Sequence, residues 1–190
     1  MPVATVFGSS TAGPDDPCSR EAFALGAGLA GRGFVVRNGG YDGVMAAVSA
    51  GARSAGGHVV GVTTAGLDSR RTPNRHLTEV HTEADLFDRL RRLIRGADLF
   101  VAFDECGPGT VNEVVLVWAL RVVGEIGPDV PLILVGDRWP RLLEGLQGGF
   151  SSKWNMDAGT IVVPTTSAAL DVIDRRFPRS RSGMAEASGD

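Results

Sequence analysis

The stretch DLFVAFDECGPGTVNEV, residues 98–114, decides the fold of this chain. It begins with an apolar run of strand length, 98–103, and ends in a segment of helical periodicity, 110–124. Between the two lies a glycine turn with two carboxylates in front of it and a third behind it. A buried strand that passes through a glycine turn into a helix is the repeating unit of a parallel α/β sheet, so the stretch predicts this class of fold.

The same alternation of short apolar runs and helical segments extends over most of the chain. Nearly all of the runs are continuously apolar, as strands buried on both faces are. We therefore predict an α/β, Rossmann-like fold, in which a doubly wound, mostly parallel sheet of about six strands carries helices on both faces. The predicted strands are 3–7, 34–37, 58–62, 98–103, 131–135 and 160–164, and the predicted helices are 18–32, 43–56, 84–95, 110–124, 140–147 and 166–176.

Length and charge limit the organisation of the chain and its partners. A chain of 190 residues favours a single domain, which we expect over residues 1–177. A disordered tail is expected over 178–190, where the residues are mostly small and polar. The net charge of -3 and the pI near 5.6 provide no positive field for nucleic acid or for an anionic membrane, so neither is expected as a partner.

Cysteine content and the N-terminal segment point to an intracellular protein without a metal. Cys18 and Cys106 are too few for a disulfide framework, and no Cys/His cluster indicates a metal site, so no metal and no cofactor are expected. The start, MPVATVFGSS, lacks the basic and apolar regions of a signal peptide, and no apolar run reaches membrane-spanning length. A cytoplasmic location is therefore predicted.

Glycine-rich segments follow the first two predicted strands, where ligands of such sheets bind. These segments are FGSSTAG, residues 7–13, and NGGYDG, residues 38–43. Their glycines would bring backbone N–H groups to an anion, and the serines would add hydroxyl groups; equally, each segment is an ordinary tight turn. The candidate residues for binding phosphate or nucleotide are Gly8, Ser9, Ser10, Gly39, Gly40 and Gly43.

The glycine turn of the opening stretch is the third candidate site. Gly107, Gly109 and Thr110 precede a helix whose N–H groups would face a phosphate. Glu113, one turn further, would point toward whatever the phosphate carries. Alternatively, Thr110 and Glu113 have the T-x-x-E spacing of a capping box, in which the glutamate folds back on its own helix terminus.

A run of arginines in ADLFDRLRRLIRG, residues 84–96, supplies candidate cations. The apolar residues of this segment form one stripe at helical spacing, and Arg89 and Arg91 border the stripe at opposite edges. For Arg92 and Arg95 we expect a solvated helix face. Arg89 is the better candidate for a functional cation if the other edge of the stripe faces solvent.

The ordered segments VFGSSTAG, GGYDGVMAAVSAGARSAGGHVVGV, LFDRLRRLI, GPGTVNE and PLILVG together resemble the Lonely Guy (LOG) family of nucleoside 5′-monophosphate phosphoribohydrolases, relatives of Rossmann-fold molybdenum-cofactor carriers. The resemblance implies hydrolysis of the N-glycosidic bond of a nucleoside 5′-monophosphate, a cytokinin riboside monophosphate or an AMP- or CMP-type nucleotide, which releases the nucleobase and ribose 5-phosphate. It also implies a homodimer or larger oligomer. The family's PGGxGTxxE and Met-His-Glu-Arg-Lys motifs place its catalytic residues at Glu113 and Arg89.

Two departures from these motifs leave a second interpretation open. Glu105-Cys106 stands where the family has Pro-Gly, and Leu90 replaces the lysine. Asp104 and Glu105 would disfavour a phosphate dianion unless they point away, pair with arginine, or contact base or ribose. The alternative is a non-catalytic protein that binds or carries a nucleotide or the molybdenum cofactor. An NAD-dependent enzyme is disfavoured because no acidic residue ends the second strand. Separately, the long loop 63–85 is expected to contribute to a base pocket.

Overall fold

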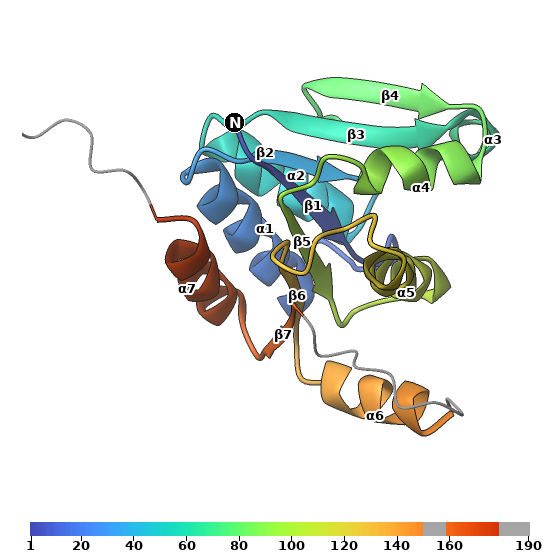
Figure 1. Ribbon diagram of the computed structural model, residues 1–190. Coiled ribbons are helices and arrows are strands. Elements are labelled where there is room, and N and C mark those ends of the chain that lie inside the picture. The colour runs from blue at the N-terminus through green and yellow to red at the C-terminus, as the bar shows by residue number, and fades with distance from the viewer. Residues whose placement is uncertain (150–158, 179–190) are drawn as a thin grey trace, which may run out of the picture.

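The computed structural model describes residues 1–149 and 159–178. Its centre is a seven-stranded sheet in the order β4-β3-β2-β1-β5-β6-β7, with every pair of neighbouring strands parallel (Figure 1). The strands are β1 (Val3–Phe7), β2 (Val35–Asn38), β3 (Val59–Thr64), β4 (Glu79–Glu83), β5 (Leu99–Phe103), β6 (Leu132–Val135) and β7 (Thr160–Val163). The predicted Rossmann-like α/β class is confirmed, with one strand more than the sequence indicated.

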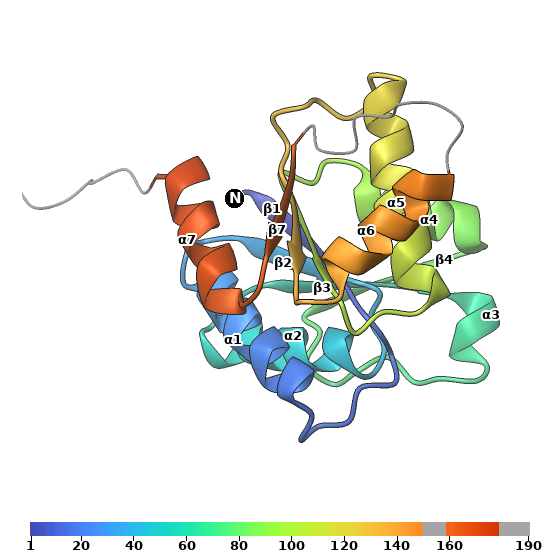
Figure 2. The ribbon, with the colours of Figure 1, turned by 90° about the horizontal axis from the view of Figure 1, so that it is seen from below.

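Helices cover both faces of the sheet. Figure 2 shows α1, α2 and α7 on one side of the strands and α4, α5 and α6 on the other. The helices are α1 (Pro17–Ala30), α2 (Val44–Ser54), α3 (Ala65–Asp68), α4 (Leu86–Ile94), α5 (Pro108–Val122), α6 (Trp139–Gly149) and α7 (Thr166–Arg176). The arrangement is the doubly wound one that right-handed crossovers between parallel strands produce.

Two hydrophobic clusters, one on each face of the sheet, hold these layers together. On the α1 side, Val6 and Val101 of the central strands pack with Leu25 of α1 and Val48 of α2. The other cluster joins the opposite faces of the same strands to α4, α5 and α6, and it includes Trp118 of α5. Because successive side chains of a strand point to opposite faces, continuously apolar strands were needed to fill both clusters.

The segment 63–85, expected to be a long loop, instead contains α3 and the edge strand β4. β4 is the sequence EVHTE, whose residues are exposed or only partly buried. It lies at the edge of the sheet, paired only with β3 among the described strands. A search for apolar runs misses such a strand because one side of it faces solvent, and charged residues at an edge discourage pairing with other chains.

Helix starts also differ from the prediction where proline is present. α5 begins at Pro108, not at residue 110, and Gly107 is the N-cap in extended conformation. Proline favours the first helical position because its fixed φ suits the helix and its missing N–H would have no partner there. Thr110 is therefore the third residue of the helix, not its cap, and the predicted capping box does not form.

The C-terminal prediction falls largely outside the described residues. α7 ends at Arg176, and the tail predicted over 178–190 lies beyond the described part of the chain except for its first residue. Within the described ranges, none of the helices is both long and apolar enough to cross a membrane.

The change in strand order positions the candidate site. β1 lies between β2 and β5, and Phe7 at the end of β1 is paired with Ala102 of β5. The chain leaves β1 toward one side of the sheet and β5 toward the other, which opens a crevice at the carboxyl ends of the two strands. The loops after these two strands are the segments that the sequence singled out.

Candidate active site

The loop after β5 delivers the N-terminus of α5 to this crevice. In the first turn of α5, the Val111 N–H donates to the carbonyl of Gly107 (3.2 Å). The preceding N–H groups, on Gly109 and Thr110, have no acceptor within the helix because an α-helix leaves its first donors unpaired. A Cβ atom added at Gly107 or Gly109 would meet no atom within 4 Å. The backbone at this helix end is therefore open to a ligand.

The loop after β1 is hydrogen-bonded to the loop after β5 and to the start of α2. The Ser9 N–H donates to the carbonyl of Glu105 (2.9 Å), and the Ser9 carbonyl accepts from the N–H of Val44 at the start of α2 (2.9 Å). This close approach explains Gly43, whose φ is +64° and whose added Cβ would lie 2.4 Å from the Ser9 carbonyl oxygen. The loops after β1, β2 and β5 thus form one hydrogen-bonded rim.

Arg89 enters the crevice from α4, which lies on the same side of the sheet as α5 (Figure 2). Its side chain is buried, and its Nε donates to the carbonyl of Val62 on β3 (2.9 Å). Nη2 reaches the carbonyl of Gly39 after β2 (3.4 Å), and the guanidinium lies 6.0 Å from the centre of the Tyr41 ring. Arg91, at the other edge of the stripe, is exposed and pairs with Asp88 on the surface. The structure thus separates the two arginines that the sequence left as alternatives.

Glu113 faces Arg89 from α5. Nη1 of Arg89 lies 3.8 Å from Oε1 of Glu113, which is an ion pair but too long for a bidentate hydrogen-bonded contact. Among the described residues, no hydrogen-bond donor contacts the Glu113 carboxylate. Burial raises the pKa of Glu113 to about 7, although the Arg89 charge acts in the opposite direction. Glu113 is therefore poised to exchange a proton near neutral pH.

A pocket of about 410 Å³ contains this pair and most of the residues predicted for phosphate or nucleotide binding. Those that line it are Gly8, Ser9, Ser10, Gly39, Gly107, Gly109 and Thr110. Gly40 and Gly43 do not. The Gly40 N–H donates to the Asn38 side chain (2.8 Å), so it is not free to bind an anion.

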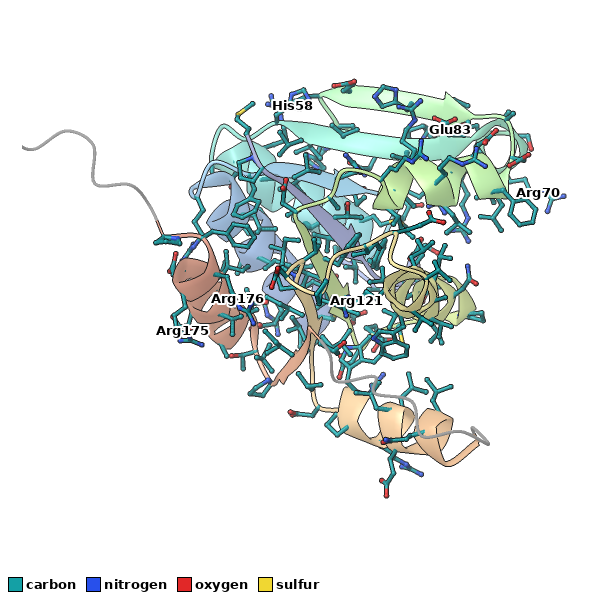
Figure 3. All side chains as sticks on the ribbon, in the orientation of Figure 1. His58, Arg70, Glu83, Arg121, Arg175 and Arg176 are labelled. Atoms are coloured by element: carbon teal, nitrogen blue, oxygen red, sulfur yellow. The ribbon has the colours of Figure 1, made fainter. Side chains whose placement is uncertain are left out.

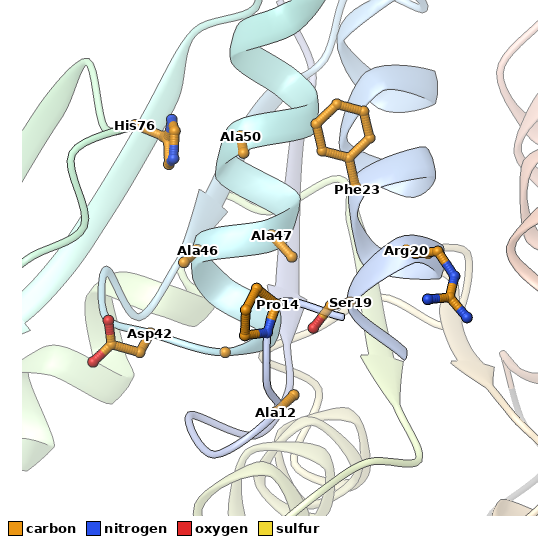
Figure 4. Close-up of a pocket in the computed structure, with 11 residues that line it drawn as sticks. Ala12, Pro14, Ser19, Arg20, Phe23, Asp42, Ala46, Ala47, Ala50 and His76 are labelled. Atoms are coloured by element: carbon orange, nitrogen blue, oxygen red, sulfur yellow. The ribbon is translucent and has the colours of Figure 1, made fainter. Parts of the chain in front are cut away.

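Gly43 lines a different pocket, of about 550 Å³, between α1 and α2. Figure 4 shows its floor of alanine side chains from α2, with Phe23 and Arg20 on α1 and His76 on the far side. Asp42 is the one carboxylate among the described residues that line this pocket, and it is exposed, not buried against a cation as Glu113 is. We therefore place the candidate chemistry in the pocket of Arg89 and Glu113, although it is the smaller of the two.

The acidic residues of the opening stretch pair away from the helix end. Glu105 Oε2 accepts a hydrogen bond from the Arg138 side chain (2.9 Å), and Asp104 accepts one from the Arg138 backbone N–H (3.0 Å). Pairing with arginine was one of the three alternatives left open above. Cys106 also lines the pocket, but burial and the nearby Asp104 and Glu105 charges raise the pKa of its thiol, which makes it a poor nucleophile.

Several pocket residues were missed by sequence reasoning. Tyr41 is almost fully buried, and its hydroxyl donates to Asp68 (2.9 Å) and accepts from the Thr64 N–H (3.1 Å). Met45, which fills space beside Gly39, and Leu67 and Arg71, which lie in and after α3, also line the pocket. Tyr41 lies in a glycine turn, in which the glycines are the residues that indicate an anion site. Arg71 follows another arginine, and nothing in the sequence indicates which of the two reaches the pocket.

Of the segment 63–85, only the part around α3 reaches the pocket. Asn74 does not line the pocket but fastens the loop after β2: its side chain donates to the Tyr41 carbonyl (3.0 Å) and its backbone N–H to the Gly40 carbonyl (2.8 Å). Arg75 is exposed, and His76 lines the pocket between α1 and α2. The described residues contain no group of three or more His, Cys, Asp or Glu that could hold a metal ion.

Comparison with known proteins identifies the family. The model of the SLOG cluster4 family matches residues 1–125. The chain belongs to the SLOG cluster4 family. This SLOG chain is 30% identical over 154 residues to the cytokinin riboside 5′-monophosphate phosphoribohydrolase of Mycobacterium tuberculosis, a match that covers 80% of this chain and 78% of the relative. It is 36% identical over 121 residues to a probable cytokinin riboside 5′-monophosphate phosphoribohydrolase of rice, Oryza sativa, covering 62% of this chain and about half, 49%, of the relative.

Solved structures share the fold of this SLOG protein. The molybdenum cofactor binding protein of Rippkaea orientalis superposes with a TM-score of 0.70 at 22% identity, and the match covers 92% of this chain and 96% of the other. At that identity the likeness shows the fold alone. The family model and the identity to the Mycobacterium tuberculosis relative confirm the expected resemblance to the LOG family, whose named relatives are hydrolases.

Proposed function

We propose that this protein hydrolyses the N-glycosidic bond of a nucleoside 5′-monophosphate, releasing the nucleobase and ribose 5-phosphate. The observation that carries the proposal is the buried pair of Arg89 and Glu113, 3.8 Å apart, in a pocket that also holds the free N-terminus of α5. A protein that only binds a nucleotide needs the helix end but not a desolvated carboxyl beside it. The names of the Mycobacterium tuberculosis and rice relatives support the same reaction.

The 5′-phosphate is assigned to the N-terminus of α5. The N–H groups of Gly109 and Thr110, together with the positive end of the helix dipole, suit a dianion. The glycines at 107 and 109 support this assignment, because neither a positive φ nor close packing requires glycine there, whereas a ligand approaching the backbone does. Phosphate binding at this end would orient the ribose toward Glu113, so that binding energy remote from the reaction serves the chemistry.

Glu113 is assigned the proton chemistry at the anomeric carbon. In its ionised form it would take a proton from water as the water oxygen bonds to C1′ and the bond from C1′ to the base nitrogen breaks. The departing base would take up a proton from solvent, and Glu113 would return its own proton to solvent, so that one water is consumed for each bond broken. A carboxylate at this position would also stabilise the oxocarbenium character of the ribose, as in other glycoside hydrolyses. Arg89 would keep the carboxylate oriented and offset part of its charge in the buried site.

The direct test is to incubate the protein separately with AMP, CMP, GMP, UMP and a cytokinin riboside monophosphate and to measure free base by chromatography. Release from one of them, abolished in Glu113→Gln, supports the proposal. The second candidate is a non-catalytic carrier of a nucleotide or of the molybdenum cofactor, which is favoured by buried Leu90 in the place of the family's lysine. Tight binding of one ligand without release of any base would favour the carrier.

A homodimer through α4 and α5 is part of the proposal. Phe87 of α4 is 78% exposed and lines a pocket of about 640 Å³ between the two helices, and the adjacent Leu86 is 53% exposed. Large apolar side chains exposed together commonly mark an interface. Sedimentation analysis of the parent and of Phe87→Glu tests this: the parent should sediment as a dimer and the variant as a monomer, while a monomeric parent would contradict it.

A further inference from the structure

The charges of the candidate active-site pocket leave one cation without a protein partner. Among the residues that line the pocket, Glu105 pairs with Arg138, and Arg89 is engaged with Glu113 and with two backbone carbonyls. Within the described residues, the Arg71 guanidinium takes part in no ion pair and in no hydrogen bond. An ionised Glu113 would repel a phosphate dianion held in the same pocket, so a free cation at its wall has a clear electrostatic use.

The backbone that carries Arg71 is held in place. Its N–H donates to the carbonyl of Leu67 (2.9 Å), which closes the turn after α3. The Asp68 carboxylate of α3 accepts hydrogen bonds from the Tyr41 hydroxyl (2.9 Å) and from the Thr63 hydroxyl of β3 (3.0 Å). The side chain is exposed at the pocket wall, but its point of attachment is tied to buried residues.

We propose that Arg71 is a substrate-binding residue that engages the 5′-phosphate of the nucleotide from the α3 side of the pocket. The inference rests on the proposed function for the presence of a phosphate ligand, but not on turnover. A guanidinium can make two parallel hydrogen bonds to phosphate oxygens, which adds to the neutral N–H donors at the start of α5. Leu90 occupies the position of the family's lysine, so that positive charge is missing from this chain. Arg71 would supply a positive charge in its place.

The adjacent Arg70 provides a matched control. It is exposed, it follows α3 as Arg71 does, and it does not line the pocket. Figure 3 shows Arg70 at the outer margin of the molecule. Arg70→Gln and Arg71→Gln therefore remove the same charge from neighbouring positions, so that any general effect of net charge is common to both variants.

The test is calorimetric titration of the full chain and the two variants with AMP, adenosine, ribose 5-phosphate and inorganic phosphate. For Arg71→Gln we expect the affinity for AMP and for ribose 5-phosphate to fall about 10-fold and the affinity for adenosine to stay unchanged, since a hydrogen bond to a charged group has this order of strength. Arg71→Lys should retain part of the affinity that Arg71→Gln loses, because lysine keeps the positive charge but cannot make the two parallel hydrogen bonds of a guanidinium. The effect should weaken at high salt.

The outcomes separate this inference from the proposed hydrolysis. If Arg71→Gln weakens AMP no more than Arg70→Gln does, or weakens adenosine equally, Arg71 does not bind the phosphate and the proposal is overturned even if the protein releases base. Selective loss of the phosphate ligands in a protein that releases no base would support Arg71 while the hydrolysis fails. A parent protein that binds none of the phosphate ligands would overturn the role of Arg71. Inorganic phosphate binding with no preference for AMP or ribose 5-phosphate would show a general anion site and would overturn the assignment to the nucleotide.

Discussion

Replacing Glu113 with glutamine should stabilise the protein at alkaline pH and remove its activity. The pKa of Glu113 is raised from an ordinary 4.5 to about 7 because the carboxyl is buried, so the ionised form destabilises the fold by about 3 kcal/mol. The direction of this pH dependence follows from proton binding: at a pH between these two pKa values, the folded state holds a proton on Glu113 that the unfolded state has lost. Stability from this group is therefore complete below pH 4.5 and is lost as the pH rises through about 7.

Urea denaturation of the parent and of Glu113→Gln at pH 4.5 and at about pH 9 measures this effect. The difference in unfolding free energy between the two proteins should shift by about 3 kcal/mol in favour of the variant at the higher pH. The exposed Glu144→Gln on α6 serves as the control and should show no such shift. A difference between parent and Glu113→Gln that is equal at both pH values would refute the reasoning. The same variant should lose about 100-fold or more in kcat/KM, as expected for a lost proton acceptor.

Three further predictions concern the same pocket. Hydrolysis by the parent should rise as the pH passes through about 7, because the ionised Glu113 is the active form; a rate independent of pH would contradict this assignment. Gly39→Ala would place a Cβ 2.1 Å from Nη2 of Arg89 and should lower kcat/KM about 10-fold, whereas Gly145→Ala, where no atom lies within 4 Å, should match the parent. Tyr41→Phe should destabilise the fold by about 1–3 kcal/mol through its lost buried hydrogen bonds. Its kcat/KM should fall modestly, because the ring beside Arg89 remains but the segment that carries Arg71 loses the hydrogen bond from Tyr41 to Asp68. Denaturation combined with kinetics checks both parts.

The part of the fold that could be predicted from sequence is the part whose residues are buried on both sides. Val101 and its neighbours in β5 form an unbroken apolar run because helices cover both faces of the strand, and that run is visible without a structure. β4 has no such run, since its outer side meets solvent. The start of α5 was misplaced because T-x-x-E spacing and a proline at the first helical position give competing signals, and proline prevailed.

Some residues of the candidate site could likewise be predicted from sequence, and others could not. Arg89 and Glu113 could be named from sequence because each stands at a fixed place in a motif, one on α4 and one on α5. Tyr41 and Arg71 could not, because their place in the pocket depends on how the loop after β2 meets α3. That meeting is set by contacts such as Tyr41 with Asp68, which lie far apart in the sequence. Periodicity and local motifs carry no information on such pairs.

The two central residues of the pocket have opposite relations to folding, and this affects how the family can diverge. Arg89 joins α4 to the carbonyls of Val62 and Gly39, so its loss would weaken the packing of three elements. Glu113, by contrast, lowers stability whenever it is ionised. If the proposed hydrolysis is the function of this chain, a descendant without it would keep Arg89 for structural reasons and would be free to replace Glu113 with a neutral residue. Under the proposed hydrolysis, the side chain at position 113 would thus be the better marker of an active member.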